Sequence, residues 1–168
     1  VCNNINQNTS YTIGRTFAYT VINRLRSNII ATGYDGRLTS PDLHKALCEG
    51  LKDSGAKVIN IGMGPTPMTY FAHYHLNADA AIMVTGSHNP SEYNGFKMVL
   101  NKHSFYAEDI QSLQKLVDQN DLKLIEGKII NQDIKKDYTE RLLQNINLNK
   151  KIKIAWDIGN GAMGAVIK

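Results

Sequence analysis

The chain has 168 residues, of which 42% are hydrophobic, and its 19 Lys and Arg against 15 Asp and Glu give a net charge of +4. This length suits one domain with part of a second, and the basic residues are too scattered to indicate a nucleic-acid-binding surface. No apolar run approaches the roughly 20 residues of a membrane span and no signal peptide opens the chain, so we exclude a membrane protein and expect a cytoplasmic one.

Helix and strand patterns alternate through the first third of the chain. Apolar residues at every fourth position predict a helix over residues 10–26, with Ser10 as its cap. A short buried strand is expected at residues 28–33. Ser40, as a capping hydroxyl followed by a proline and an aspartate, then has the features of a helix start, and Gly55 is expected to end that helix.

The middle of the chain carries three more predicted strands and one helix. Residues 57–62 form the first of these strands, and the helix begins at Pro67 and runs to about His75. Residues 79–86 are nearly all apolar, which is typical of a strand covered on both faces. Residues 94–100 return after a tight turn, so we expect them to pair with that strand in an antiparallel arrangement.

The last part of the chain combines two helices with polar connections. Apolar spacing marks one helix around residues 110–117 and another around residues 134–142, with a polar stretch at residues 119–132 between them. A strand and a glycine loop are predicted from Lys151 onward. Such a pair is typical of the opening of a further α/β domain.

This alternation of strand and helix indicates an α/β fold. We predict a three-layer α/β/α domain with a mixed sheet. The domain is assigned to residues 1–150, and residues 151–168 are assigned to the truncated start of a second domain.

One loop gathers residues that can carry chemistry. Ser87 follows Gly86 directly after a predicted strand, where the backbone can turn sharply and expose a hydroxyl at the ligand-binding edge of an α/β sheet. His88 and Lys97 could carry protons or neutralise a phosphate there. Residue types alone leave an alternative open, because Ser-His-Asn-Pro is also ordinary turn chemistry.

Other kinds of site fit the sequence poorly. The loop lacks the GxSxG pattern of a hydrolase elbow, and the chain has no GxxxxGK[ST] run for binding nucleotide phosphates. His73 and His75 are two residues apart on a predicted helix, so they would point to different faces rather than share a metal ion.

Four stretches of the sequence, taken together, resemble a known family. TGSHNP followed by YNGFK is similar to the phosphoserine loop of the α-D-phosphohexomutases, in particular the bacterial phosphomannomutase/phosphoglucomutase branch. GYDGRLTSP, GMGPTP and WDIGNGAMG resemble other parts of that family in kind and in order. The resemblance covers the chain from about residue 10 onward, and the serine loop is its most specific part.

The resemblance implies a role for each residue of the loop. Ser87 would carry phosphate as phosphoserine, pass it to a sugar monophosphate, and ligand Mg²⁺ through a phosphate oxygen. His88 and Lys97 match residues that position phosphate or assist proton movement, and Asn89 would fix the shape of the loop. Arg37 either reaches the same cleft or holds its own loop.

The chain also departs from the family pattern. A first strand ending in an arginine is expected before residue 10, and residues 1–9 do not supply it. The Asp-rich Mg²⁺ loop, the sugar-recognition loop and the C-terminal phosphate-clamping domain are absent, although the family builds its site from four domains. We therefore expect a phosphohexomutase fragment that needs the missing domains and is inactive alone.

The implied substrate and the competing hypothesis follow from the same resemblance. The substrate would be a phosphorylated hexose, and the form of the serine loop favours mannose or glucose phosphate without separating the two. The alternative hypothesis is a non-catalytic remnant that binds phosphate or a partner. A serine hydrolase is a third, weaker alternative, because no acid is indicated to orient the histidine.

Overall fold

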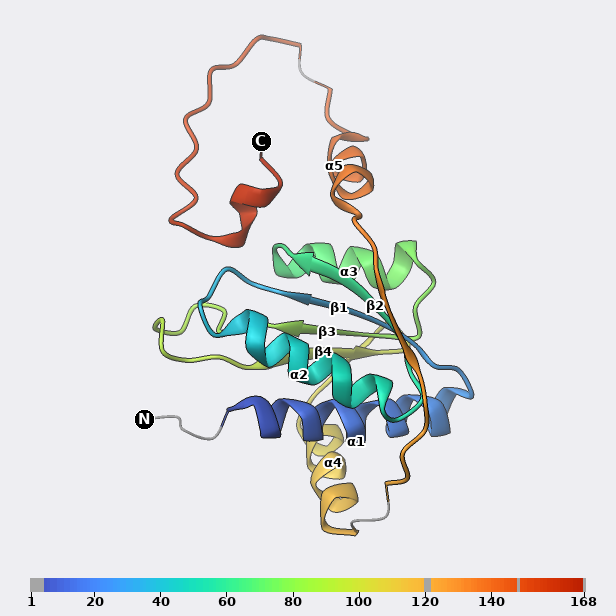
Figure 1. Ribbon diagram of the computed structural model, residues 1–168. Helices are drawn as coiled ribbons and strands as arrows, with labels where there is room; N and C mark the ends of the chain where they lie inside the picture. Colours follow the sequence, from blue (N-terminus) through green and yellow to red (C-terminus); the bar gives the residue numbers. More distant parts are fainter. Residues whose placement is uncertain (1–4, 120–121, 148, 168) are drawn as a thin grey trace.

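The computed structural model describes residues 5–119, 122–147 and 149–167, which form one mixed sheet covered by helices (Figure 1). The elements in chain order are α1 (Gln7–Leu25), β1 (Ile29–Tyr34), α2 (Ser40–Lys52), β2 (Lys57–Met63), α3 (Thr66–His75), β3 (Ala80–Val84), β4 (Phe96–Leu100), β5 (His103–Phe105), α4 (Glu108–Gln119), β6 (Lys128–Asn131), α5 (Lys135–Leu143) and the 3₁₀ helix η1 (Ala162–Ala165). No described helix is both long enough and apolar enough to cross a bilayer.

The sheet has six strands in the order β5-β4-β3-β1-β2-β6. The pairs β3–β1, β1–β2 and β2–β6 are parallel, whereas β4 runs antiparallel to β3 and β5 antiparallel to β4. Figure 1 shows α1 and α2 on one side of the sheet and α3 on the other. The predicted three-layer α/β/α domain with a mixed sheet is confirmed, including the antiparallel return of β4.

Two hydrophobic clusters hold the layers together, one on each face of the sheet. Alternate residues of β1 illustrate the division, because Ile30 packs beneath α1 and α2 while Ala31 packs against α3. Phe17 of α1 is fully buried and meets Phe105 edge-on, with ring centroids 5.2 Å apart. Side chains of successive strand residues point to opposite faces, so buried β1 serves both clusters.

The helices α1 and α2 approach each other backbone to backbone. A Cβ atom at Gly14 would lie 2.4 Å from the Leu47 carbonyl oxygen, and one at Gly50 would lie 2.1 Å from the Tyr11 carbonyl oxygen. Both contacts are too short for any side chain. The close packing fixes α2 against the domain, and the N-terminus of α2 borders the serine loop.

Two predicted helix caps are wrong. Helix α1 begins at Gln7, and its cap is Asn6, whose Oδ1 accepts from the Thr9 amide; Ser10 instead donates its hydroxyl to the Asn6 carbonyl one turn earlier. Ser40 is the first residue of α2 rather than its cap, and its hydroxyl donates to a carboxylate at the end of β1. Tertiary contacts therefore replace the expected local cap at Ser40.

The strand predictions fail at the edges and at the C-terminus. β5 and β6 were not predicted, because each is a short edge strand and β6 offers only two apolar residues, Ile129 and Ile130. The strand expected after Lys151 is not formed: Ile152 and Trp156 are exposed, and the described residues offer no neighbouring strand to pair with this segment. In Figure 1 this segment is coloured red and leads back to η1.

Candidate active site

Ser87 lies in the loop that connects β3 to β4, at the edge of the sheet where the parallel strands end. Its φ is 54°, a left-handed conformation that is unfavourable for residues other than glycine. The Ser87 amide donates to Thr85 Oγ1 at 2.8 Å, which helps to hold this turn. The turn leaves the Ser87 side chain exposed to solvent.

The structure brings His88 and Lys97 to the Ser87 hydroxyl. Lys97 Nζ donates to Ser87 Oγ at 3.3 Å, and His88 Nδ1 lies 3.4 Å from the same oxygen. Lys97 reaches the site because β4 returns in register beside β3, with Lys97 opposite Met83. An ammonium group at this place can stabilise negative charge on a phosphoryl group carried by the serine. The three side chains predicted as catalytic thus lie together.

Arg37 clamps the serine loop from the loop that follows β1. Its terminal nitrogens donate to four backbone carbonyls, those of Ser87, Asn89, Pro90 and Tyr93. Its Nε lies 3.4 Å from Asp35 Oδ2. These four hydrogen bonds engage both terminal nitrogens of the guanidinium, so Arg37 braces the serine loop, and the residue also lines the cleft in front of it.

The backbone of Asn89 takes part in the hydrogen bonding of the serine loop, and the role that the resemblance implies for its side chain stays a prediction. Its amide donates to the Gly86 carbonyl at 3.0 Å, and its own carbonyl accepts from Arg37 at 2.6 Å. Gly86 is required by the same arrangement, because a Cβ there would lie 2.2 Å from Arg37 Cζ and 2.5 Å from the Tyr93 carbonyl oxygen. The loop is therefore fixed mainly through its peptide groups.

A cleft of about 980 Å³ opens in front of Ser87 and His88. Its other walls are the loop after β1, the start of α3 and the C-terminal glycine loop Gly159–Met163. This volume is in the range of small-molecule sites. Two carboxylates that the sequence reasoning missed, Asp35 and Glu92, also line the cleft. The position of Asp35 directly after a parallel strand is the signal that could have indicated it.

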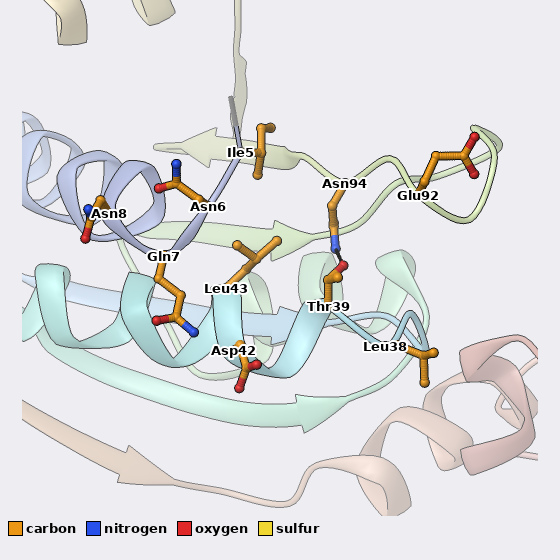
Figure 2. A pocket seen from close by; sticks show the side chains of 10 residues that line it. All are labelled: Ile5, Asn6, Gln7, Asn8, Leu38, Thr39, Asp42, Leu43, Glu92 and Asn94. Atoms are coloured by element: carbon orange, nitrogen blue, oxygen red, sulfur yellow. Dashed lines mark hydrogen bonds between the residues drawn. The ribbon is translucent and has the colours of Figure 1, made fainter. Parts of the chain in front are cut away.

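A second hollow of about 520 Å³ lies beside this cleft and shares Leu38, Thr39 and Glu92 with it (Figure 2). Figure 2 shows Asn94 of the serine loop pointing to Thr39 at the start of α2, and Asn94 Nδ2 donates to Thr39 Oγ1 at 3.1 Å. The Leu38 side chain is 98% exposed. The wall between the two hollows thus consists of residues from the β1–α2 loop and the serine loop.

The described residues do not fit a complete Mg²⁺ site. Nowhere among them do three or more His, Cys, Asp or Glu side chains come together in a group that could hold a metal ion. Mg²⁺ is usually held by one or two carboxylates in near-octahedral geometry. His73 is buried, whereas His75 is partly exposed and lies 3.3 Å from Asp137, so these two histidines form no shared site.

With this geometry established, comparison with known proteins identifies the class. Residues 1–124 match the family described as phosphoglucomutase/phosphomannomutase, alpha/beta/alpha domain I. The chain belongs to this family, as its resemblance to the phosphohexomutases predicted.

Individual relatives agree with this assignment. A phosphomannomutase/phosphoglucomutase of Pseudomonas aeruginosa is 39% identical over 158 residues, which cover 94% of this chain and 34% of that protein. A phosphoglucomutase of Neisseria meningitidis is also 39% identical over 158 residues, covering 93% and 34%. The crystal structure of a phosphoglucomutase/phosphomannomutase family protein from Burkholderia thailandensis superposes with a TM-score of 0.82 at 34% identity, covering 89% of this chain and 34% of that one. The chain spans about a third of the length of these relatives.

Proposed function

We propose that this chain is the phosphoserine-bearing part of a phosphomannomutase/phosphoglucomutase that interconverts hexose 1-phosphate and hexose 6-phosphate. The observation that carries the proposal is the exposed Ser87 hydroxyl, held in a left-handed turn at the mouth of the cleft with Lys97 Nζ 3.3 Å away. The names of the relatives support a hexose phosphate as the substrate.

In the proposed reaction, the phosphate on Ser87 Oγ moves to a free hydroxyl of a hexose monophosphate. The P–Oγ bond breaks, a P–O bond to the sugar forms, and the proton of the sugar hydroxyl passes to Ser87 Oγ, which becomes a hydroxyl again. The bisphosphorylated sugar then reorients and returns its other phosphate to Ser87. Lys97 stabilises the charge on the transferring group, and His88, 3.4 Å from Ser87 Oγ, moves a proton.

Mg²⁺ and the location of the reaction are further parts of the proposal. The serine phosphate would supply one oxygen to the ion, and the remaining ligands would be water or groups that the described residues do not provide. We therefore expect the 168-residue chain to be inactive on its own and to need the rest of a complete phosphohexomutase. As a separate part of the proposal, we place the reaction in the cytoplasm.

Mass spectrometry tests the proposal. The chain would be mixed with the separately expressed remainder of the Pseudomonas aeruginosa relative, Mg²⁺ and glucose 1,6-bisphosphate, and then mapped by peptide mass. We expect one phosphoryl group, on Ser87, and none in a Ser87→Ala variant. Phosphate on a different residue would overturn the assignment. Binding of the sugar bisphosphate without transfer would instead support the non-catalytic, phosphate-binding alternative.

A further inference from the structure

Asp35 lies directly after β1, and both of its carboxylate oxygens are engaged. Oδ1 accepts from the Ser40 hydroxyl at 2.6 Å and from the Arg37 amide at 3.1 Å. Oδ2 accepts from the Gly86 amide at 3.2 Å and lies 3.4 Å from Arg37 Nε. The Asp35 side chain is only 16% exposed. Three hydrogen-bond donors and the ion-paired Arg37 guanidinium therefore converge on one largely buried carboxylate.

The contacts of Asp35 join the serine loop to the end of β1 and to the Arg37 guanidinium. The Asp35 amide donates to the Val84 carbonyl at 3.0 Å, which extends the β1–β3 pairing by one residue. The carboxylate then holds the Gly86 amide, immediately before Ser87. The carboxylate also orients the Arg37 guanidinium, which packs against Gly86 and donates to the carbonyls of Ser87 and Asn89. Asp35 thus holds the Gly86 amide, which precedes Ser87, and orients the Arg37 side chain that binds the carbonyls of the serine loop.

The other end of the serine loop is tied to the same carboxylate through Ser40. Asn94 Nδ2 donates to Ser40 Oγ at 2.8 Å, and the Ser40 hydroxyl donates in turn to Asp35. Asn94 also donates to Thr39, as Figure 2 shows. Both ends of the loop, at Gly86 and at Asn94, are therefore connected to Asp35 within two hydrogen bonds.

We propose that Asp35 is a positioning residue that keeps Ser87 in its left-handed turn with the hydroxyl directed to the cleft. A serine with a φ of 54° is held there by its surroundings, and Asp35 is the group on which those surroundings converge. The carboxylate can accept from the three donors and face the Arg37 guanidinium at once because it has only acceptor sites and carries a negative charge. An asparagine would place an amide donor against at least one of them and would remove the charge beside Arg37.

Nuclear magnetic resonance on the 168-residue chain tests the structural part of this inference. In Asp35→Asn we expect hydrogen exchange of the Gly86 amide to rise about tenfold, because a hydrogen bond to a charged group is lost. The three-bond coupling of the Ser87 amide should move toward the value of an extended residue. The matched control is Asp53→Asn, which removes a carboxylate and its bond from the Tyr11 hydroxyl at the opposite end of α2.

A milder variant decides the question if Asp35→Asn fails to fold. Ser40→Ala removes one hydrogen bond to Asp35 and leaves the charge in place, so we expect a smaller rise in Gly86 exchange in the same direction. If Asp35→Asn folds, unchanged hydrogen exchange of the Gly86 amide and an unchanged Ser87 coupling would overturn the inference. If it does not fold, the same unchanged values in Ser40→Ala would overturn it.

The kinetic part rests on the proposed function. With the remainder of the Pseudomonas aeruginosa relative added, Asp35→Asn should lower kcat about tenfold and leave KM nearly unchanged, whereas Asp53→Asn should alter neither. Equal losses in the two variants would contradict a positioning role. The two proposals fail separately: a wild type that never carries phosphate on Ser87 refutes the proposed function, while an unaltered loop in Asp35→Asn refutes only the inference.

Discussion

His44 provides a direct test of the core packing that supports α2. The side chain is 4% exposed, and its Nε2 lies 3.1 Å from Thr32 Oγ1 on β1. Burial lowers the pKa of His44 from 6.5 to about 4, because the charged ring would lose its hydration. The folded protein therefore holds this histidine neutral in a range of pH where the unfolded chain protonates it.

The direction of the effect follows from proton binding. Between about pH 6.5 and 4 the unfolded chain binds more protons at His44 than the folded chain, so the free energy of unfolding falls as the pH falls through this range. A shift from 6.5 to about 4 corresponds to about 3 kcal/mol in total, at about 1.4 kcal/mol per pH unit. Below about pH 4 the loss from this residue is complete.

Urea unfolding at a series of pH values measures this contribution. We expect His44→Gln, which cannot titrate, to lose about 3 kcal/mol less stability than the wild type between about pH 6.5 and 4. His103→Gln, at an exposed position on β5, is the matched control. If His44→Gln and the wild type show the same pH dependence, the reasoning about the buried ring is refuted.

Two further predictions concern the serine loop. Gly86→Ala should destabilise the domain by about 1–3 kcal/mol in urea unfolding, because its Cβ would overlap the guanidinium that clamps the loop, whereas Gly95→Ala, whose nearest contact is at 3.5 Å, should cost clearly less; equal costs would contradict the clamp. Lys97→Met should slow phosphate transfer to Ser87 about 30-fold in the mixture with the relative's remaining domains. Lys97 Nζ lies 3.3 Å from Ser87 Oγ, and a unit negative charge that developed on this oxygen during transfer would interact with the ammonium by about 1–5 kcal/mol between the dielectric limits of water and a protein surface. The exposed Lys115→Met on α4 is the charge-matched control, and an equal loss there would refute a local role for Lys97.

The fold was predictable where burial leaves a strong local pattern. Every residue of β3, Ala80–Val84, is buried, and the apolar run in the sequence reflects this directly. β6 could not be predicted in the same way, because its four residues become a strand by pairing with β2 more than sixty positions earlier. The segment from Lys151 has the opposite problem, since its pattern fits a strand but no described strand lies beside it.

The candidate site, too, was predictable only where its residues lie close together in the sequence. Ser87 and His88 are adjacent in sequence, and Lys97 follows on the return strand, so a local pattern contained all three. Asp35 and Arg37 are about fifty positions away, and only the register of β1 beside β3, with Tyr34 opposite Val84, brings them to the serine loop. Contacts of that range depend on the topology of the whole sheet rather than on the local sequence.

The most direct test of the central claim compares two serines of the same loop. Mutase activity would be measured with mannose 1-phosphate, Mg²⁺ and a bisphosphate primer, using the chain together with the remainder of the Pseudomonas aeruginosa relative. The proposal predicts that Ser87→Ala abolishes turnover and that Ser91→Ala, at an exposed position four residues later, retains it. Sustained turnover by Ser87→Ala would contradict the assignment of Ser87 as the phosphoryl carrier.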